Sequence, residues 1–236
     1  MGLQGPRARA RIGSAELGRA RHGPELLVTD LVVCFATPVE GEGLPRAIAG
    51  RSLALLRTGV GPVNAAFALT RFLAEHPARA VVACGVGGAY PGSGLEVGDV
   101  VCAESETYGD LGAESVAGFL DMEALGFPVI EGDPPLFNRL PVDLFPAARR
   151  APFVTCATCT GTDERAIRLA VRTGGAVESM EGAAVVHVAR LMGVKVGEVR
   201  GIWNAAGDRD RTRWRVRAAA AAARAALVAW IEAGGC

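Results

Sequence analysis

The residues best suited to chemistry are polar side chains at the ends of predicted strands. Glu40 follows the strand predicted over 26–36, and Asn204 ends the strand predicted over 194–203. Glu181 stands between a short extended segment and a helix. Sheets in α/β proteins bind ligands beyond the carboxyl ends of their strands. A carboxylate there can act as a general base, and an amide can both donate and accept hydrogen bonds.

The acids near the start of this helix differ in how easily a structural role explains them. Glu178 or Ser179 could serve as a helix cap, because acceptors are common near helix N-termini. Glu181 is harder to explain as a cap, since the small residues that follow it leave space beside it. Glu181 is therefore the better candidate for binding a ligand.

A glycine-rich segment, Gly85-Val86-Gly87-Gly88-Ala89-Tyr90, could indicate a dinucleotide site. That fingerprint needs a third glycine where Tyr90 stands, and its loop must open directly into a helix. Here a second loop and another strand follow. We therefore predict a loop between strands, either a plain turn or a backbone that approaches a ribose or a water, and no organic cofactor.

The cysteines and histidines give no metal or redox site. Cys156 and Cys159 have the spacing of such a pair, but no second close pair of Cys or His exists to complete a zinc site. On a strand predicted over 153–159, residues three apart point to opposite faces, so core packing is favoured. His187 lies in an apolar helical stretch and is predicted to be a satisfied, partly buried histidine.

Strands that alternate with helices must position these residues. Strands are predicted over 26–36, 52–58, 80–85, 99–103, 153–159, 176–179 and 194–203, and helices over 63–75, 163–172, 180–192 and 217–232. The stretch 104–153 is predicted to form loops with short helices. This alternation predicts an α/β protein with a doubly covered sheet, in one domain over 26–236. Residues 1–25 are predicted to be a disordered N-terminal extension.

Composition excludes several classes of function. Half of the 236 residues are hydrophobic, and 25 basic residues balance 25 acidic ones. This excludes a disordered chain and gives no global attraction to nucleic acid. No uncharged stretch reaches the roughly 20 apolar residues of a membrane helix. The six cysteines, with no secretory signal before them, predict reduced thiols in the cytoplasm.

Five motifs in order resemble the purine nucleoside phosphorylase and nucleosidase superfamily, over about 26–230. The motifs are Gly59-Val60-Gly61-Pro62-Val63-Asn64-Ala65-Ala66, Gly85-Val86-Gly87-Gly88-Ala89, Leu95-Glu96-Val97-Gly98-Asp99-Val100, Glu178-Ser179-Met180-Glu181-Gly182-Ala183-Ala184 and Val199-Arg200-Gly201-Ile202-Trp203-Asn204. Segments at 90–95, 110–114 and 118–121 most resemble its futalosine hydrolase branch, of the alternative menaquinone pathway. The resemblance implies a three-layer α/β/α sandwich around a mixed, partly barrel-like sheet.

The resemblance also implies a set of roles. Glu40 matches the glutamate that activates water, and Glu181 matches the one that binds ribose hydroxyls. Asn204 stands where adenine-specific relatives carry an Asp that protonates the leaving purine. The implied substrate-binding residues are Gly85, Val86, Gly87, Ser179, Met180 and Glu181, with no metal or organic cofactor.

The departure at Asn204 has a physical explanation. A 6-amino purine offers a donor and favours a carboxylate, whereas a 6-oxo purine offers an acceptor and favours an amide N–H. The amide oxygen can at the same time accept from N7–H. Asn204 therefore suits hypoxanthine, and the expected reaction is hydrolysis of futalosine to hypoxanthine and dehypoxanthine futalosine.

Several alternatives stay open at this point. The protein could be a phosphorylase or nucleosidase for an inosine-like or methylthioadenosine-like nucleoside, or a non-catalytic nucleoside-binding protein. The benzoate of futalosine could meet an arginine within 208–215, or Arg200, which could instead pair with a nearby acid. Tyr90, Tyr108 and Phe119 are candidates to stack on the base. The relatives imply a homo-oligomer.

Overall fold

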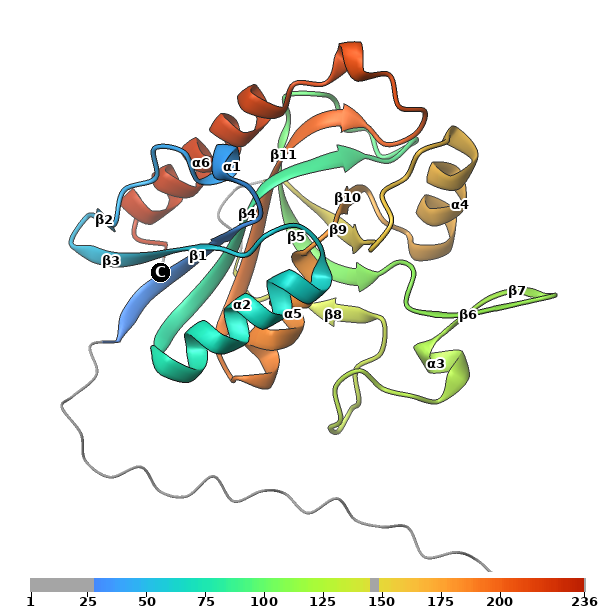
Figure 1. Cartoon of the computed structure of the whole chain (residues 1–236), viewed down its shortest axis with the longest axis horizontal. Coiled ribbons are helices and arrows are strands. Elements are labelled where there is room, and N and C mark those ends of the chain that lie inside the picture. The colour runs from blue at the N-terminus through green and yellow to red at the C-terminus, as the bar shows by residue number, and fades with distance from the viewer. Residues whose placement is uncertain (1–27, 145–148, 236) are drawn as a thin grey trace, which may run out of the picture.

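Five strands close into a ring at the centre of the protein, and the other elements are built around it (Figure 1). In residues 28–144 and 149–235, which the computed structural model describes, nine strands form one mixed sheet in the order β10-β9-β5-β11-β4-β1-β3-β2, with β8 joined to β5. β10 also pairs with β4, which closes the ring β4-β11-β5-β9-β10. The strands are β1 (Thr29–Phe35), β2 (Ala47–Ile48), β3 (Arg51–Arg57), β4 (Ala78–Ala89), β5 (Val100–Tyr108), β8 (Arg139–Pro141), β9 (Arg150–Thr155), β10 (Val177–Ser179) and β11 (Lys195–Ala205).

Helices cover both faces of this sheet. The helices are α1 (Pro38–Gly41), α2 (Pro62–Glu75), α3 (Met122–Leu125), α4 (Asp163–Thr173), α5 (Gly182–Leu191) and α6 (Val216–Glu232). α2 and α5 pack against each other on one face, and α6 packs on β11 and β4 on the other (Figure 1). The predicted three-layer α/β/α arrangement with a partly barrel-like mixed sheet is confirmed.

Two apolar layers hold the helices to the sheet. Leu69 of α2 and Val186 of α5 lie in one layer, and Leu227 and Ile231 of α6 lie in the other. Complete burial of such a side chain contributes about 1.5–3 kcal/mol to the free energy of unfolding. The alanines of α6 favour a helix and let it approach the strands closely.

β4 differs from its prediction in an informative way. The sequence predicts a strand over 80–85 followed by a glycine-rich loop, whereas the strand continues through that segment to Ala89. Gly85 pairs with Arg200 of β11, and Gly88 pairs with Asn204. A Cβ on Gly85 would collide with Glu40 Oε1, and one on Gly88 would lie 2.9 Å from Asn204 Oδ1. The glycines therefore provide room for neighbouring side chains rather than a turn.

The prediction for 104–153 was wrong in part. β5 extends to Tyr108, and the hairpin of β6 (Gly112–Ser115) and β7 (Gly118–Asp121) projects beyond the sheet (Figure 1). β8 and most of β9 also fall in this stretch. These strands are short and separated by Gly and Pro, so their apolar periodicity is weak. The extension predicted over 1–25 lies outside the described residues.

Candidate active site

Most of the predicted site residues meet at one cavity of about 320 Å³ at the carboxyl ends of β1, β4 and β11. Its lining includes Glu40, Val86, Ser179, Met180, Glu181 and Asn204. Gly85 and Gly87 are not in the lining; they lie behind it, where Gly88 reaches the cavity instead. A larger cavity of about 720 Å³ between α4 and the β6–β7 hairpin is lined by Phe119, a candidate to stack on the base, but by none of the predicted catalytic or substrate-binding residues.

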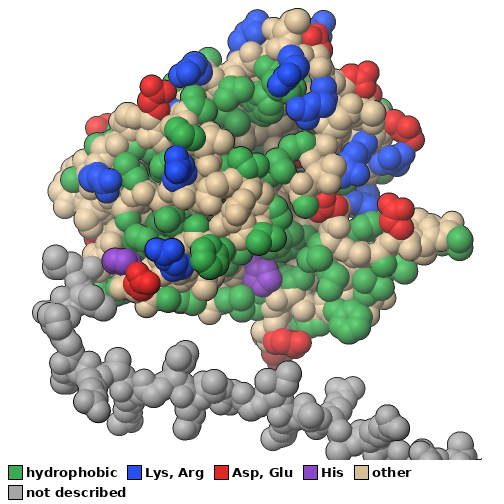
Figure 2. All heavy atoms as spheres, viewed as in Figure 1, with side chains coloured by type: hydrophobic (Ala, Val, Ile, Leu, Met, Phe, Trp, Pro, Cys, Tyr) green, Lys and Arg blue, Asp and Glu red, His purple; other side chains and the backbone are tan. Residues whose placement is uncertain are grey.

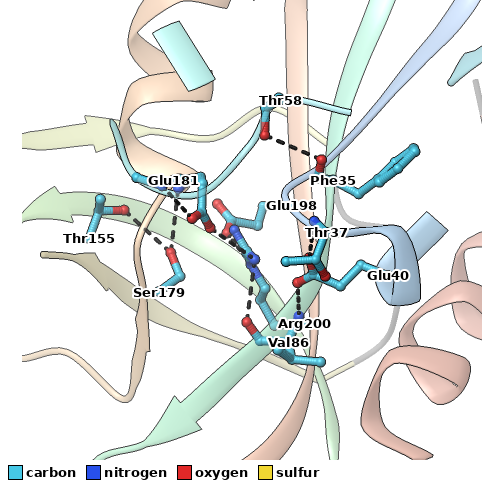
Figure 3. Close-up of polar contacts among 12 residues, drawn as sticks. Phe35, Thr37, Glu40, Thr58, Val86, Thr155, Ser179, Glu181, Glu198 and Arg200 are labelled. Atoms are coloured by element: carbon cyan, nitrogen blue, oxygen red, sulfur yellow. Dashed lines mark hydrogen bonds and ion pairs between the residues drawn. The ribbon is translucent and has the colours of Figure 1, made fainter. Parts of the chain in front are cut away.

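Glu40 is fixed in place by three backbone and side-chain donors. It lies in α1, directly after β1, and its side chain is buried. Oε2 accepts from the Thr37 amide and hydroxyl, each at 2.8 Å, and Oε1 accepts from the Val86 amide at 3.0 Å (Figure 3). In all three contacts the carboxyl oxygens of Glu40 are the acceptors. Glu40 is therefore held as an acceptor at the wall of the cavity.

Glu181 lies opposite, at the start of α5. Although it is the residue that precedes the helix, its side chain makes no cap and turns to the cavity. Oε1 accepts from the Gly61 amide at 2.9 Å, and Oε2 lies 3.7 Å from Nη1 of Arg200 (Figure 3). Burial raises the pKa of Glu181, and the Arg200 charge opposes that rise.

Arg200 is the buried cation between these acids. Its Nε donates to Glu198 Oε1 at 2.7 Å, and Nη1 donates to the Val86 carbonyl at 3.3 Å. Burial works against its charge, but Glu198, Glu181 and Glu40 together outweigh burial and raise its pKa. Arg200 is thus the partner of nearby acids and does not line the cavity. Of the two candidates for an arginine that meets the substrate, Arg200 and the 208–215 segment, only the segment has a residue in the lining.

Asn204 has one hydrogen-bonding group in use and one free. Its Nδ2 donates to the Ala205 carbonyl at 2.8 Å. Its Oδ1 is buried and has no hydrogen-bond partner among the described residues. A buried acceptor without a donor costs free energy, so its position favours a ligand that brings an N–H.

Glu178 and Ser179 organise the wall of the cavity. Glu178 accepts from the Tyr90 hydroxyl at 2.9 Å and from the amide and hydroxyl of Thr160. Ser179 Oγ lies 3.4 Å from both the Thr155 hydroxyl and the Gly182 amide (Figure 3). Neither carboxylate oxygen of Glu178 accepts a hydrogen bond from an amide of α5, so the prediction that Glu178 caps this helix was wrong. Ser179 does contact the amide of Gly182, the first residue of the helix.

The aromatic lining comes from residues that the sequence analysis did not select. Trp203 and Trp214 line the cavity, and their rings meet edge to face with centroids 4.6 Å apart. Tyr90 is buried against Glu178, and neither Tyr108 nor Phe119 is in the lining. The position of Trp203 beside Asn204 was the available sequence signal.

Arg209 supplies positive charge to the same wall. Of the arginines predicted within 208–215, Arg209 is the one in the cavity lining. Its guanidinium carbon lies 5.0 Å from the centre of the Trp214 ring, a cation–π arrangement. The other charged lining residues, Glu40, Glu178 and Glu181, are acidic.

The thiols and His187 take no part in this site's charge pattern. Cys156 is buried and free, but Cys159 is exposed at the cavity, so core packing was wrong for Cys159. The reason is that β9 ends at Thr155 and the chain turns out of the sheet. His187 is half-buried and within 3.2 Å of the Tyr108 hydroxyl, which confirms a satisfied histidine. Among the described residues, no three His, Cys, Asp or Glu form a group that could hold a metal ion.

Comparisons with known proteins show the family to which this chain belongs. The family model of the phosphorylase superfamily matches residues 46–232. Futalosine hydrolase of Thermus thermophilus is 36% identical over 175 residues, which are 70% of this chain and 75% of that protein. Futalosine hydrolase of Streptomyces coelicolor is 38% identical over 163 residues, 66% of this chain and 69% of that protein.

Solved structures share the fold at low identity. The native futalosine hydrolase of Helicobacter pylori has a TM-score of 0.73 and 15% identity, covering 87% of this chain and 98% of that one. The 5′-methylthioadenosine/S-adenosylhomocysteine nucleosidase of Neisseria meningitidis, solved with methylthio-immucillin-A, has a TM-score of 0.72 and 20% identity, covering 87% and 100%. The chain therefore belongs to the phosphorylase superfamily and, within it, to the futalosine hydrolase family.

Proposed function

We propose that this protein hydrolyses the N-glycosidic bond of futalosine and releases hypoxanthine and dehypoxanthine futalosine. The observation that carries the proposal is the single cavity that brings Glu40, Glu181 and the unpartnered Oδ1 of Asn204 together. The relatives named futalosine hydrolase support the same reaction.

Each of the three residues answers one need of the reaction. The bond from the sugar C1′ to the purine breaks with its electron pair leaving on the base, which takes up a proton from solvent at N7, and a water molecule adds to C1′. Glu40 accepts the proton of that water, as a general base. Glu181 accepts hydrogen bonds from ribose hydroxyls, with Met180 against the sugar. Asn204 Oδ1 accepts from N7–H, and its N–H, released from Ala205, donates to the 6-oxo group.

The charges around the cavity favour water over phosphate as the nucleophile. Glu40, Glu178 and Glu181 are acidic lining residues, and they would repel a phosphate dianion near C1′. Val86, Gly85 and Gly87 would act by their backbone: the Val86 amide holds Glu40, Gly85 leaves room for Glu40 and Arg200, and Gly87 leaves room for Val177.

We propose that Arg209 binds the benzoate carboxylate of futalosine. It is the cationic residue in an otherwise acidic lining, and Trp214 beneath it offers a flat apolar surface for an aromatic ring. A guanidinium fork binds carboxylates in a bidentate manner. This end of the cavity would therefore admit the one anionic group of the substrate.

The test is release of hypoxanthine from futalosine by the purified protein, with inosine and methylthioadenosine in parallel. We expect turnover on futalosine that is unchanged by added phosphate. Strict dependence on phosphate would establish a phosphorylase, and binding without release of base would establish a non-catalytic nucleoside-binding protein.

We also propose a homo-oligomer that works in the cytoplasm. Val63 and Phe67 of α2 are 80% and 66% exposed, and Leu191 at the end of the neighbouring α5 is 63% exposed. Figure 2 shows hydrophobic side chains gathered on this side of the molecule. Sedimentation of the protein and of Phe67→Glu would test the oligomer.

The proposed compartment is supported by the described cysteines, which are all free thiols, as is usual in a reducing compartment. No helix in the described part of the chain has the length and apolarity to cross a bilayer.

A further inference from the structure

Two carboxyl groups that the proposed reaction does not use face each other behind the cavity. Glu106 of β5 and Glu198 of β11 are both completely buried. Both converge on Gly182, the first residue of α5, where a Cβ would collide with Glu106 Oε1 and with both oxygens of Glu198. Only a glycine at this position leaves space for the pair.

The hydrogen bonds around the pair are incomplete. Glu106 Oε2 accepts from the Thr155 hydroxyl at 2.9 Å, and Glu198 Oε1 accepts from Arg200 Nε at 2.7 Å. The other oxygens, Glu106 Oε1 and Glu198 Oε2, have no donor among the described residues. Two buried acceptors that face each other repel unless one of them carries a proton, which then donates to the other.

We propose that Glu106 and Glu198 share one proton and that this singly charged pair is the positioning element for Arg200. The bond from Glu198 fixes the guanidinium at Nε. Nη1 of the same group is thereby held 3.3 Å from the Val86 carbonyl and 3.7 Å from Glu181 Oε2.

The charge of the pair matters for Glu181. One proton shared by two carboxyls leaves a single negative charge, which balances Arg200. Glu181 then need not neutralise Arg200, and its Oε2 stays free for a ribose hydroxyl. Without the charge of the pair, Arg200 would be drawn onto Glu181 and occupy that oxygen.

The neighbouring titratable groups are consistent with one proton on the pair. Burial, and after it the adjacent Glu198, raises the pKa of Glu106 well above its ordinary value. Glu181 and Glu40 also face Arg200 and stabilise its charge. Burial and Glu106 raise the pKa of Tyr108, and burial lowers that of His187, so both are neutral around pH 7.

Glutamine variants separate a shared charge from two independent carboxylates. Glu106→Gln supplies a permanent N–H to Glu198, and Glu198→Gln leaves Glu106 free to ionise. Each single variant keeps one negative charge, so we expect kcat/KM for futalosine within about threefold of wild type. The double variant loses the charge, and we expect its kcat/KM to fall about 10- to 100-fold, chiefly because KM rises.

The matched control is Glu104→Gln, an exposed glutamate on the same strand, which should leave kcat/KM unchanged. The proposal would be overturned if the fall in kcat/KM of the double variant equalled the product of the falls in the two single variants. It would also be overturned if the double variant were as active as the single variants.

The kinetic test rests on the proposed function, because it measures hydrolysis of futalosine. A second measurement needs no substrate, so it can fail or succeed independently of the proposed function. Infrared spectra at neutral pH should contain the C=O stretch of a buried carboxylic acid, and Glu106→Gln should remove it. The folded protein retains a proton that the unfolded chain releases above the ordinary pKa of 4.5. Wild type should therefore lose stability relative to Glu106→Gln as pH rises from about 4.5 to the raised pKa of Glu106. Absence of the carboxylic acid band, together with a difference in Tm that does not vary with pH, would exclude the shared proton.

Discussion

Asn204 directs its free Oδ1 toward Gly88, its pairing partner across β11 and β4, and a Cβ on Gly88 would lie 2.9 Å from that oxygen. The glycine therefore keeps open the approach to the acceptor on which purine recognition depends in the proposed function. Asn204 is the residue at which a choice between 6-oxo and 6-amino bases would be made.

Asn204→Asp should change the preference between these bases. With a 6-oxo purine the new carboxylate sets an acceptor against O6, and an unpaired buried polar group costs about 1–3 kcal/mol. We expect kcat/KM for futalosine to fall about 10- to 100-fold, at ~1.4 kcal/mol per decade. Relative activity on aminofutalosine should rise. Parallel assays of both substrates check this, and an equal fall for the two would remove Asn204 from base recognition.

Glu40→Gln should lower kcat with little change in substrate binding. The amide keeps the shape of the side chain but cannot take a proton from water, and general base catalysis contributes about 100- to 10,000-fold. The measurement is steady-state hydrolysis of futalosine. Glu42→Gln, at an exposed position two residues on, is the matched control and should remain fully active. Near-normal kcat for Glu40→Gln would mean that another group is the base.

Gly85→Ala should impair the reaction while the fold persists. Gly85 has no positive φ, so the backbone tolerates alanine, but the new Cβ would collide with Glu40 Oε1 and lie 2.7 Å from Arg200 Nη1. A displacement of about 1 Å at a catalytic group can cost about 100-fold in rate, and we expect kcat to fall by that order. Gly132→Ala is the control, because its Cβ would meet only the Pro134 carbonyl at 3.5 Å. Unchanged kcat in Gly85→Ala would show that Glu40 can move without penalty.

Arg209→Ala should weaken futalosine binding selectively. Hydrogen bonds to charged groups contribute about 1.5–3 kcal/mol, so KM for futalosine should rise about 10- to 100-fold. KM for inosine, which has no carboxylate, should stay the same. Arg211→Ala is a close control. The guanidinium carbon of Arg211 lies 5.2 Å from the centre of the Trp214 ring, a distance similar to that of Arg209, but Arg211 does not line the cavity. A matching rise for inosine would indicate a general effect on the cavity instead.

The sequence predicted most of the central sheet but less of its periphery. β1, β3, β4 and β11 are long apolar strands whose pattern stands out, and the apolar spacing of α2 and the alanines of α6 indicate those two helices. The three-residue β8 pairs with β5, far along the chain, which local patterns do not contain. The strands of the β6–β7 hairpin have four residues each and are mostly exposed, so they carry little apolar alternation.

The candidate site divides in the same way. Glu40, Glu181 and Asn204 could be identified because each stands at the end of a regular element. Trp214 could not be identified, and Arg209 could be identified only as one of the arginines within 208–215. Both come from the stretch between β11 and α6 and reach the cavity only through tertiary packing. The proximity of Glu106 and Glu198 also could not be read from the sequence, because the two residues lie on strands that are far apart in the chain and pair only in the fold, next to Gly182.

Closure of the ring by β10 has a consequence for how copies of this chain can associate. A sheet recruits another chain through the unpaired amides and carbonyls of an edge strand. Here every strand of the ring has a partner on both sides, so the ring leaves no strand edge open beside the cavity. In the proposed homo-oligomer, copies of this chain would therefore associate without changing the strand register around the cavity.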